Sequence, residues 1–514
     1  MMGHTLRSQL VTRIQSAPFF SIIADTTSDV SRVDQLSIVI RWMEGLKIHE
    51  TFLVFLRVTD ATATGLTKLI TDFLQKIGLD LNKLRGQGYD GASVMSGQLR
   101  GVQQQMRGLT GGASAVPFVH CAAHNLNLVI NDAVKAATQS SAFFDTVSEI
   151  YVFFGSSLNR WAELAFSPES AKLLKLKKVC PTRWSSRVTA IRAIKNRYLC
   201  ILKVLCKISL TSNSTKERAD ANGLRKKIET FEFLVFLMFW ERLLLVIDRA
   251  SRELQSSEMD LGRAAILLRM AMKDLEFLRS DWKSITLTAS AIAINWKVEA
   301  RFVEKRAWKI KKFYDELSND ERLINPEDAF RAHVFYPAVD TALNQLRSRF
   351  KGQQAVCEAF DFLMPSNLAE HSSRVIHDGV TSLITLYPSD FGSVDDILTE
   401  LRQFSREFKE NLQEISTVYS LFTLLRESKL LPSMPETATA ISLFLTLPVT
   451  VATAERSFSK LKIIKNYLRS SMSQTRLDGL SLLAIEYEEA KSVNWKNTIK
   501  TFASKNVIRR SKFG

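Results

Sequence analysis

Residues 19–25, Phe-Phe-Ser-Ile-Ile-Ala-Asp, open the stretch of sequence that decides the fold. The apolar run ends at Asp25, and a polar segment follows it. Two further runs, Leu36–Met43 and Thr51–Val58, are rich in β-branched and aromatic residues, and the Glu44-Gly45 pair between them is typical of a turn. Three such runs predict an antiparallel β-meander. A helix is predicted next over Thr62–Ile77, where apolar residues recur at helical spacing.

The rest of the chain reads mostly as helix. Val116–Cys121 is a strand candidate that leads into a predicted helix over Ala122–Ala136. From about residue 140 to about residue 430, successive segments carry apolar residues at i, i+3, i+4 and i+7. More helices are predicted near the end, at Thr453–Tyr467 and Gln474–Ala490. The sequence therefore predicts an α/β beginning, a large helical block and a short helical end.

The composition limits the protein class. Hydrophobic residues make up 46% and charged residues 24% of the 514 residues, which is typical of a globular chain and excludes a disordered or collagen-like one. Five Cys, an odd number, argue against a disulfide framework and favour a reducing compartment. Charged residues interrupt the most apolar stretch, Phe231–Ile247, so no membrane span is predicted.

The positive charge of the chain is clustered. The formal net charge is +16, and residues 171–197, residues 460–476 and the tail after Glu489 are basic and contain no Asp or Glu. Basic stretches without acids are typical of a protein with a polyanionic partner. For any single cluster a solvated basic face remains the alternative, whereas several clusters together favour nucleic acid.

Two motifs resemble ligand-binding sites, but we interpret both as structural. Gly86–Gly91 matches the dinucleotide pattern G-x-G-x-x-G, but no acidic residue follows at the required distance, so a turn is predicted there. His120, Cys121 and His124 lack a second ligand pair at zinc-binding spacing, which favours a core cysteine with a hydrogen-bonded histidine. No phosphate-binding loop and no Ser/His/Asp arrangement is recognisable.

Three carboxylates carry the most specific chemistry. Asp25 ends a predicted strand, Asp90 lies in the glycine-rich segment, and Glu455 lies at the start of a predicted helix. If they converge, they can hold two Mg²⁺ ions about 3.5–4 Å apart and support phosphoryl transfer. The alternatives are local roles: a turn cap for Asp25, a left-handed backbone for Asp90 and a favourable helix dipole for Glu455.

Five blocks occur in one order along the chain: FFSIIADTTSDVSRVDQLSIVIRW, LRGQGYDGASVMSG, FVHCAAHNLNLVI, CPTRWSSR and TLPVTVATAERSFSKLKIIKNYLRSSMSQTRLDGLSLLAIE. Together they resemble the hAT transposase superfamily, in the branch with an N-terminal DUF4371-type region and a C-terminal hAT dimerisation region. The resemblance implies an α/β plus α fold, in which a large all-helical insertion domain interrupts an RNase H-like core. The implied parts are residues 1–136 as the first part of the core, 137–430 as the insertion, 431–490 as the dimerisation region that completes the core, and 491–514 as a basic tail.

The resemblance also implies roles for single residues. Asp25, Asp90 and Glu455 match a DDE triad that would bind Mg²⁺ or Mn²⁺, and Cys121 and His124 match a C-x-x-H element. Arg183 and Trp184 match an Arg-Trp pair of the family. Together with Lys177, Lys178 and Arg187 of the basic cluster at residues 171–197, they are the expected DNA contacts.

We therefore expect a transposon-derived, nuclear protein that binds DNA and forms a homodimer or higher homo-oligomer. If it is active, its expected chemistry is DDE-type strand cleavage. The alternative is a catalytically inactive, domesticated or truncated transposase that acts as a dimerisation and DNA-interaction module. No Cys precedes Phe19, so the zinc finger usual at the start of such transposases is missing, which favours a truncated copy.

Overall fold

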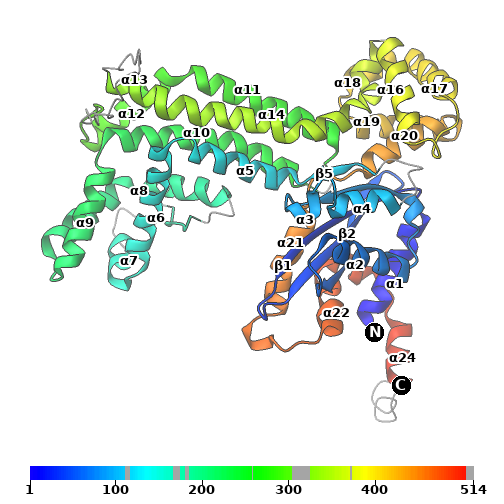
Figure 1. Cartoon of the computed structure of the whole chain (residues 1–514), viewed down its shortest axis with the longest axis horizontal. Coiled ribbons are helices and arrows are strands. Elements are labelled where there is room, and N and C mark those ends of the chain that lie inside the picture. Colours follow the sequence, from blue (N-terminus) through cyan, green and yellow to red (C-terminus); the bar gives the residue numbers. More distant parts are fainter. Residues whose placement is uncertain are drawn as a thin grey trace, which may run out of the picture. The chain divides into compact units, whose positions relative to one another are not determined.

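The computed structural model describes residues 1–109, 116–165, 174–179, 184–256, 259–303, 325–370 and 373–504. These residues form a mixed α/β structure with a five-stranded sheet and a large helical region (Figure 1). The strands are β1 (Phe20–Ser28), β2 (Asp34–Glu44), β3 (Lys47–Arg57), β4 (Leu84–Tyr89) and β5 (Phe118–His120).

The helices up to residue 254 are α1 (Met2–Ser16), α2 (Ala63–Lys76), α3 (Ser93–Ser96), α4 (Val102–Leu109), α5 (Ala122–Lys135), α6 (Thr138–Gly155), α7 (Leu158–Ala165), α8 (Trp184–Thr211), α9 (Thr215–Ile228) and α10 (Phe231–Leu254). Those between residues 261 and 427 are α11 (Leu261–Ser280), α12 (Trp282–Trp296), α13 (Pro326–Phe330), α14 (Tyr336–Glu358), α15 (Pro365–Ala369), α16 (Ser373–Leu386), α17 (Val394–Glu407), α18 (Lys409–Glu414) and α19 (Val418–Glu427). The last helices are α20 (Pro435–Thr446), α21 (Ala452–Ile464), α22 (Gln474–Ile485), α23 (Tyr487–Ser492) and α24 (Lys496–Ser504).

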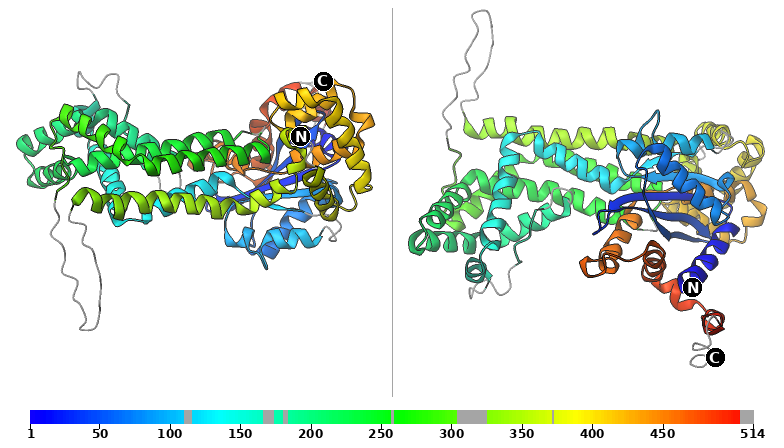
Figure 2. Two further views of the ribbon diagram at one scale, coloured as in Figure 1. Left: turned by 90° about the horizontal axis from the view of Figure 1, so that it is seen from above. Right: turned by 60° about the horizontal axis from the view of Figure 1, so that its bottom comes forward.

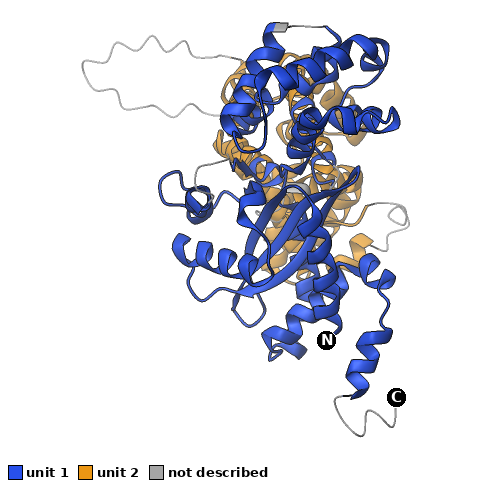
Figure 3. Cartoon of the chain, turned by 90° about the vertical axis from the view of Figure 1, so that its right-hand side faces the viewer, with its two compact units in different colours: residues 1–125, 253–267, 350–514 blue, residues 126–252, 268–349 orange. Residues whose placement is uncertain are grey.

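The chain divides into two compact units, coloured separately in Figure 3. Unit 1 consists of residues 1–125, 253–267 and 350–514 and contains the sheet. Unit 2 consists of residues 126–252 and 268–349 and, in its described part, is built from helices. The domain boundaries expected from the sequence, at residues 136, 430 and 490, stay a prediction.

The sheet confirms the predicted meander. Its strand order is β3-β2-β1-β4-β5, with β1, β2 and β3 antiparallel in succession and with β4 and β5 parallel to β1. Helix α2 begins where the sequence places it, because the Thr62 side chain accepts a hydrogen bond from the amide of Gly65 at 3.2 Å and so caps the first turn. The meander and this helix are thus local features that the sequence pattern specifies.

The turn predicted over Gly86–Gly91 is wrong, because its first four residues belong to the buried strand β4. A Cβ on Gly86 would lie 2.5 Å from Ser21 Oγ and 2.9 Å from Pro448 Cδ, and one on Gly88 would lie 3.1 Å from Pro448 Cβ. Glycine is therefore needed here for the close approach of Pro448 to the sheet, not for a tight turn. The contact that explains these glycines joins residues 360 positions apart, and no local pattern reports it.

The C-terminal helices complete unit 1. Helix α21 lies on one face of the sheet, where Ser457 Oγ is 2.9 Å from Ser37 Oγ and the Phe458 ring stacks on Phe55 (Figure 2). Helix α4 lies on the other face, where Gln87 donates to the carbonyl of Gln103 at 2.9 Å. The sheet is therefore covered on both sides by helices from distant parts of the chain.

The edge strand β3 is closed by side chains. Arg7 of α1 donates to the carbonyl of Leu53, and Gln474 of α22 donates to the carbonyl of Phe55 at 2.8 Å. Glu486 accepts a hydrogen bond from the amide of Phe52 at 2.6 Å. Because a bare strand edge offers unpaired backbone groups to other strands, these contacts protect β3 and join the two ends of the chain.

Unit 2 is held by an aromatic core and by ion pairs between long helices. Phe143 stacks on Phe236 with ring centroids 5.1 Å apart, and the Phe144 ring meets Trp240 edge-on. Helices α10, α11 and α14 run side by side (Figures 1 and 2), and Arg279 of α11 pairs with Asp340 of α14 at 2.5 Å. The large helical region predicted from the sequence is confirmed. Among the helices in the described ranges, none is both long enough and apolar enough to cross a membrane.

Candidate functional site

Asp25 and Asp90 come from neighbouring parallel strands. The pairing of β1 with β4 places Ile23 opposite Gly88. Asp25 lies two residues after Ile23, and Asp90 lies two residues after Gly88. Asp25 lies in β1 opposite Ser37 and accepts a hydrogen bond from the amide of Thr26 at 2.8 Å. Asp90 directly follows β4 and accepts one from the amide of Ala92 at 3.3 Å. The parallel register therefore brings the two carboxylates to the same end of the sheet.

Glu455 reaches this end of the sheet from α21. It lies in the first turn of that helix, where its amide donates to the carbonyl of Val451 at 3.0 Å. The amide of Val451 in turn donates to Cys121 Sγ at 3.4 Å, and the Cys121 thiol donates to Glu455 Oε1 at 3.8 Å. Cys121 is thus the residue that ties the start of α21 to the end of β5.

The three carboxylates interact electrostatically. The pKa of Asp25 is raised to about 8, mainly by burial and in addition by the nearby carboxylates of Asp90 and Glu455. Burial also raises the pKa of the Cys121 thiol well above its usual range, and Glu455 adds to this effect. At neutral pH the Asp25 carboxyl is therefore largely protonated, and Cys121 is a neutral thiol rather than a thiolate.

The carboxylates have the oxygen chemistry that Mg²⁺ prefers. In the described part of the chain, however, no group of three or more His, Cys, Asp or Glu residues is arranged so that it could hold a metal ion. The structure brings the triad near one end of the sheet without closing it into a metal site. Metal binding by Asp25, Asp90 and Glu455 stays a prediction.

The C-x-x-H element packs beside Gly91, the residue after Asp90, where a Cβ would lie 3.5 Å from His124 Cδ2. Cys121 is buried and accepts a hydrogen bond from the amide of His124 at 3.5 Å. His120 lies against the backbone of Gly91, where a Cβ would be 2.5 Å from its Nε2 atom. His120 was not among the predicted site residues. Its signal in the sequence was its position at the end of a predicted strand, and this strand, β5, lies parallel to β4, which delivers Asp90.

The expected DNA contacts lie in unit 2 and have different surroundings. Lys177 and Lys178 are exposed. Arg187 on α8 is only 8% exposed, and its guanidinium lies 5.2 Å from the centre of the Phe144 ring. A direct phosphate contact by Arg187 would require it to leave this packing. Arg183 lies outside the described residues, and α8 begins at Trp184. All five assignments stay predictions.

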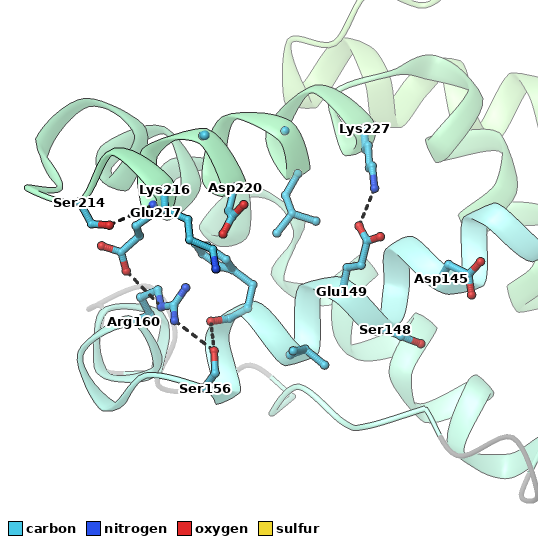
Figure 4. A pocket seen from close by; sticks show the side chains of 15 residues that line it. Asp145, Ser148, Glu149, Ser156, Arg160, Ser214, Lys216, Glu217, Asp220 and Lys227 are labelled. Atoms are coloured by element: carbon cyan, nitrogen blue, oxygen red, sulfur yellow. Dashed lines mark hydrogen bonds and ion pairs between the residues drawn. The ribbon is translucent and has the colours of Figure 1, made fainter.

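A cavity in unit 2 contains none of the predicted site residues (Figure 4). It measures about 1140 Å³ and is lined by α6, α7 and α9. Its walls carry paired charges: Arg160 lies 3.3 Å from Glu217, and Lys227 lies 2.6 Å from Glu149. The lining also contains Asp145, Lys216 and Asp220, so the cavity carries charges of both signs.

Comparison with known proteins identifies both ends of unit 1. Residues 3–101 match DUF4371, described as the ZMYM1/FAM200 RNase-like domain, and residues 400–489 match the hAT family C-terminal dimerisation region. Two curated relatives, from Mus musculus and Homo sapiens, are both named "52 kDa repressor of the inhibitor of the protein kinase". Each is 23% identical to this chain over 94% of its length. The aligned part covers 64% of each relative, so the chain spans less than two thirds of their length. The chain is therefore one in which an N-terminal DUF4371 RNase-like region is combined with a C-terminal hAT dimerisation region.

Proposed function

We propose that this chain is a transposon-derived, hAT-type protein that binds DNA and associates with itself. In this proposal an RNase H-like core is built from the two ends of the chain, and the long helical segment between them is an insertion. The observation that carries the proposal is the joint packing of residues 3–101 and 400–489 in one unit, in which α21 covers the sheet and α22 closes its edge.

Self-association is supported by the matched dimerisation region and by its surface. Although α21 and α22 bury one side in unit 1, the matched region still exposes large apolar side chains. The exposed ones between residues 460 and 489 are Ile463, Tyr467, Leu468, Leu480 and Tyr487. Exposed apolar side chains that gather in one region are typical of an interaction surface.

The test of self-association is light scattering of the full chain at micromolar concentration. We expect a dimer or larger oligomer, and we expect the double variant I463E/L468E to shift it toward the monomer. Ile463 and Leu468 are 69% and 76% exposed, so the variant should keep its thermal stability. A monomeric wild-type chain contradicts the proposal.

DNA binding is supported by charge. The chain carries a net charge of +16, and α21 alone presents Lys460 and Lys462 on its exposed side. In the described ranges neither lysine makes an ion pair with an acidic side chain. Exposed cations without acidic partners are the groups that neutralise phosphates. A nuclear location is part of this proposal, and a fluorescent fusion confined to the cytoplasm would contradict it.

Strand cleavage is a second candidate function, favoured by the mutual repulsion of Asp25, Asp90 and Glu455. Mg²⁺ or Mn²⁺ is the cofactor proposed with it. Because the carboxylates do not close into a set that could hold a metal ion, we derive no reaction step through one. The test is nicking of supercoiled plasmid in Mg²⁺ or Mn²⁺, with Asp90→Asn as the matched variant. Equal nicking by both proteins would show that the triad is not responsible.

The alternative, a non-catalytic interaction module, is favoured by the two relatives, whose name describes a repressor. The same nicking assay distinguishes a DNA-cleaving enzyme from a non-catalytic interaction module, because the module would bind DNA and self-associate without cutting the plasmid. Binding that survives in Asp90→Asn together with an absence of nicking in both proteins would support the module.

A further inference from the structure

A groove lies between the end of β1 and the end of α21, on the same two elements that carry Asp25 and Glu455. It encloses about 360 Å³ and is lined by Thr27, Ser28, Asp29, Val30, Leu461, Lys462, Lys465, Asn466 and Tyr467. We call it the β1–α21 groove. Figure 1 shows α21 beside β1, which places the groove within unit 1.

The walls of the groove are fixed. Lys465 donates to Asp29 at 2.6 Å, and the side chains of this pair are only 6% and 0% exposed. Ser31 donates to the carbonyl of Ser470 at 2.8 Å and so ties the β1–β2 loop to the segment after α21. Because these contacts join both sides, the groove keeps its shape without a ligand.

Two side chains of the groove are left for a ligand. Lys462 is exposed and makes no ion pair with any described residue, whereas Lys465 is neutralised by Asp29. Tyr467 is 78% exposed. Asn466 accepts a hydrogen bond from the amide of Leu468 at 3.1 Å and caps the short turn that presents Tyr467. The groove therefore offers one unneutralised cation and one aromatic ring held at its rim.

The groove lies next to the carboxylates of Asp25, Asp90 and Glu455, which we call the carboxylate cluster. Thr27 follows two residues after Asp25 on β1, a rise of about 7 Å. Lys462 follows seven residues after Glu455 on α21, which is about two turns and about 10 Å. Residues seven apart on a helix share a face, so Lys462 and Glu455 project on the same side of α21. A single strand whose backbone passes the cluster can thus reach the groove.

We infer that the β1–α21 groove binds one unpaired nucleotide of a DNA strand, with the phosphate on Lys462 and the base stacked on Tyr467. This inference rests on the proposed DNA binding and adds its location and strand preference. A base can stack on Tyr467 only where it has left the duplex, so the groove should prefer single-stranded DNA or an unpaired end.

The test is fluorescence anisotropy of the full chain with a labelled 20-nucleotide single strand and with the corresponding duplex. We expect wild type to bind the single strand more tightly. Tyr467→Ala should lose about tenfold in single-strand affinity, because base stacking on an aromatic ring is lost, and Tyr467→Phe should stay within about twofold of wild type. Lys462→Gln should weaken binding and reduce the salt slope by about 0.7, the value for one phosphate contact on a single strand.

The matched control is Lys460→Gln, because Lys460 is an exposed lysine on the same helix that does not line the groove. Equal losses in Lys460→Gln and Lys462→Gln would mean that only general charge matters and would overturn the inference. So would a Tyr467→Ala variant that binds like wild type. If Tyr467→Ala instead lowers the oligomeric state and leaves binding intact, the ring belongs to an interface between copies. Failure of wild type to bind either DNA would overturn the proposed function itself.

Discussion

Replacing Lys465 by Met tests whether the two ends of the chain fold as one unit. Lys465 belongs to the region that matches the hAT dimerisation family, and Asp29 belongs to the DUF4371 region. Their ion pair is 2.6 Å long, and the two side chains are 6% and 0% exposed. Met is close to Lys in length but cannot neutralise Asp29, so the substitution leaves a buried carboxylate without its cation.

The expected loss follows from the surroundings of Asp29. Removing one partner of a buried ion pair costs about 3–5 kcal/mol. Asp29 keeps hydrogen bonds from the amides of Ser31 and Val33 and from the side chain of Gln35, which favours the lower end of this range. We therefore expect a loss of about 3 kcal/mol in the free energy of unfolding at pH 7, measured by urea denaturation with tryptophan fluorescence.

The deficit should also depend on pH. In the wild-type protein burial acts to raise the pKa of Asp29, but hydrogen bonds from Lys465 and its other donors outweigh burial, so the pKa lies below its ordinary value. That contribution to stability is present above pH 4 and is lost as the pH falls. Without Lys465 burial prevails, so the Asp29 carboxyl is accommodated better when protonated. The loss in the free energy of unfolding caused by Lys465→Met should therefore become smaller as the pH is lowered from 7 to 4.

Two controls make this result specific. Lys462→Met removes an exposed lysine one turn earlier and should change stability by less than about 0.5 kcal/mol. The double variant D29N/K465M removes both charges and should recover most of the loss. The reasoning is refuted if Lys465→Met costs less than about 1 kcal/mol, or if it adds a separate early transition that leaves the sheet folded.

Three further predictions concern other residues. Asp25→Asn should stabilise the protein increasingly as the pH rises from 4 to 8, because a carboxyl with its pKa raised to about 8 costs stability over that window, by at most about 5 kcal/mol; equal melting temperatures at pH 5 and pH 8 would contradict the raised pKa. Gly86→Ala should cost about 1–3 kcal/mol, since its Cβ would lie 2.5 Å from Ser21 Oγ, whereas Gly223→Ala in α9, with no atom within 4 Å, should stabilise by about 0.5–1 kcal/mol; urea midpoints that move in the same direction would show that the close packing of β4 is not the cause. Arg187→Met should leave the stability unchanged or higher, because burial already lowers the pKa of Arg187 and two of its nitrogens have no hydrogen-bond partner; a loss of DNA affinity without a loss of melting temperature would instead support the predicted phosphate contact.

Secondary-structure elements could be predicted from the sequence where neighbouring residues determine them. The meander follows from three β-rich runs, and helix α2 follows from apolar spacing with Thr62 as its cap. The sequence pattern failed at Gly86 and Gly88, because both glycines lie against Pro448, which is far away in the chain, and Gly86 also lies against Ser21. Helix α9, which begins at Thr215, forms in a segment that is rich in polar residues. The Ser214 cap, the buried Ala221 and Leu224, and the high helix propensity of the Lys, Arg and Glu residues explain this helix.

The candidate site was only partly predictable for the same reason. Asp25 and Asp90 could be named from strand ends, but their shared position depends on the pairing of Ile23 with Gly88. Glu455 is delivered by a helix that follows Asp25 by more than 400 residues, and its link to Cys121 is visible only in the fold. The β1–α21 groove was signalled only by the basic cluster at residues 460–476, because Lys462 and Tyr467 stand out within it only once Lys465 is seen to be neutralised by Asp29.

The most direct test of the account is the salt dependence of DNA binding by the wild-type full chain. Affinity for a 20-nucleotide single strand is measured by anisotropy between 50 and 200 mM salt. If Lys and Arg side chains neutralise several phosphates, the logarithm of the affinity should fall linearly with the logarithm of the salt concentration, with an overall loss of at least about tenfold. Saturable binding with this slope is the predicted result. The absence of saturable binding at 50 mM, or an affinity that is the same at both salt concentrations, would contradict the claim that this protein binds DNA through its basic surface.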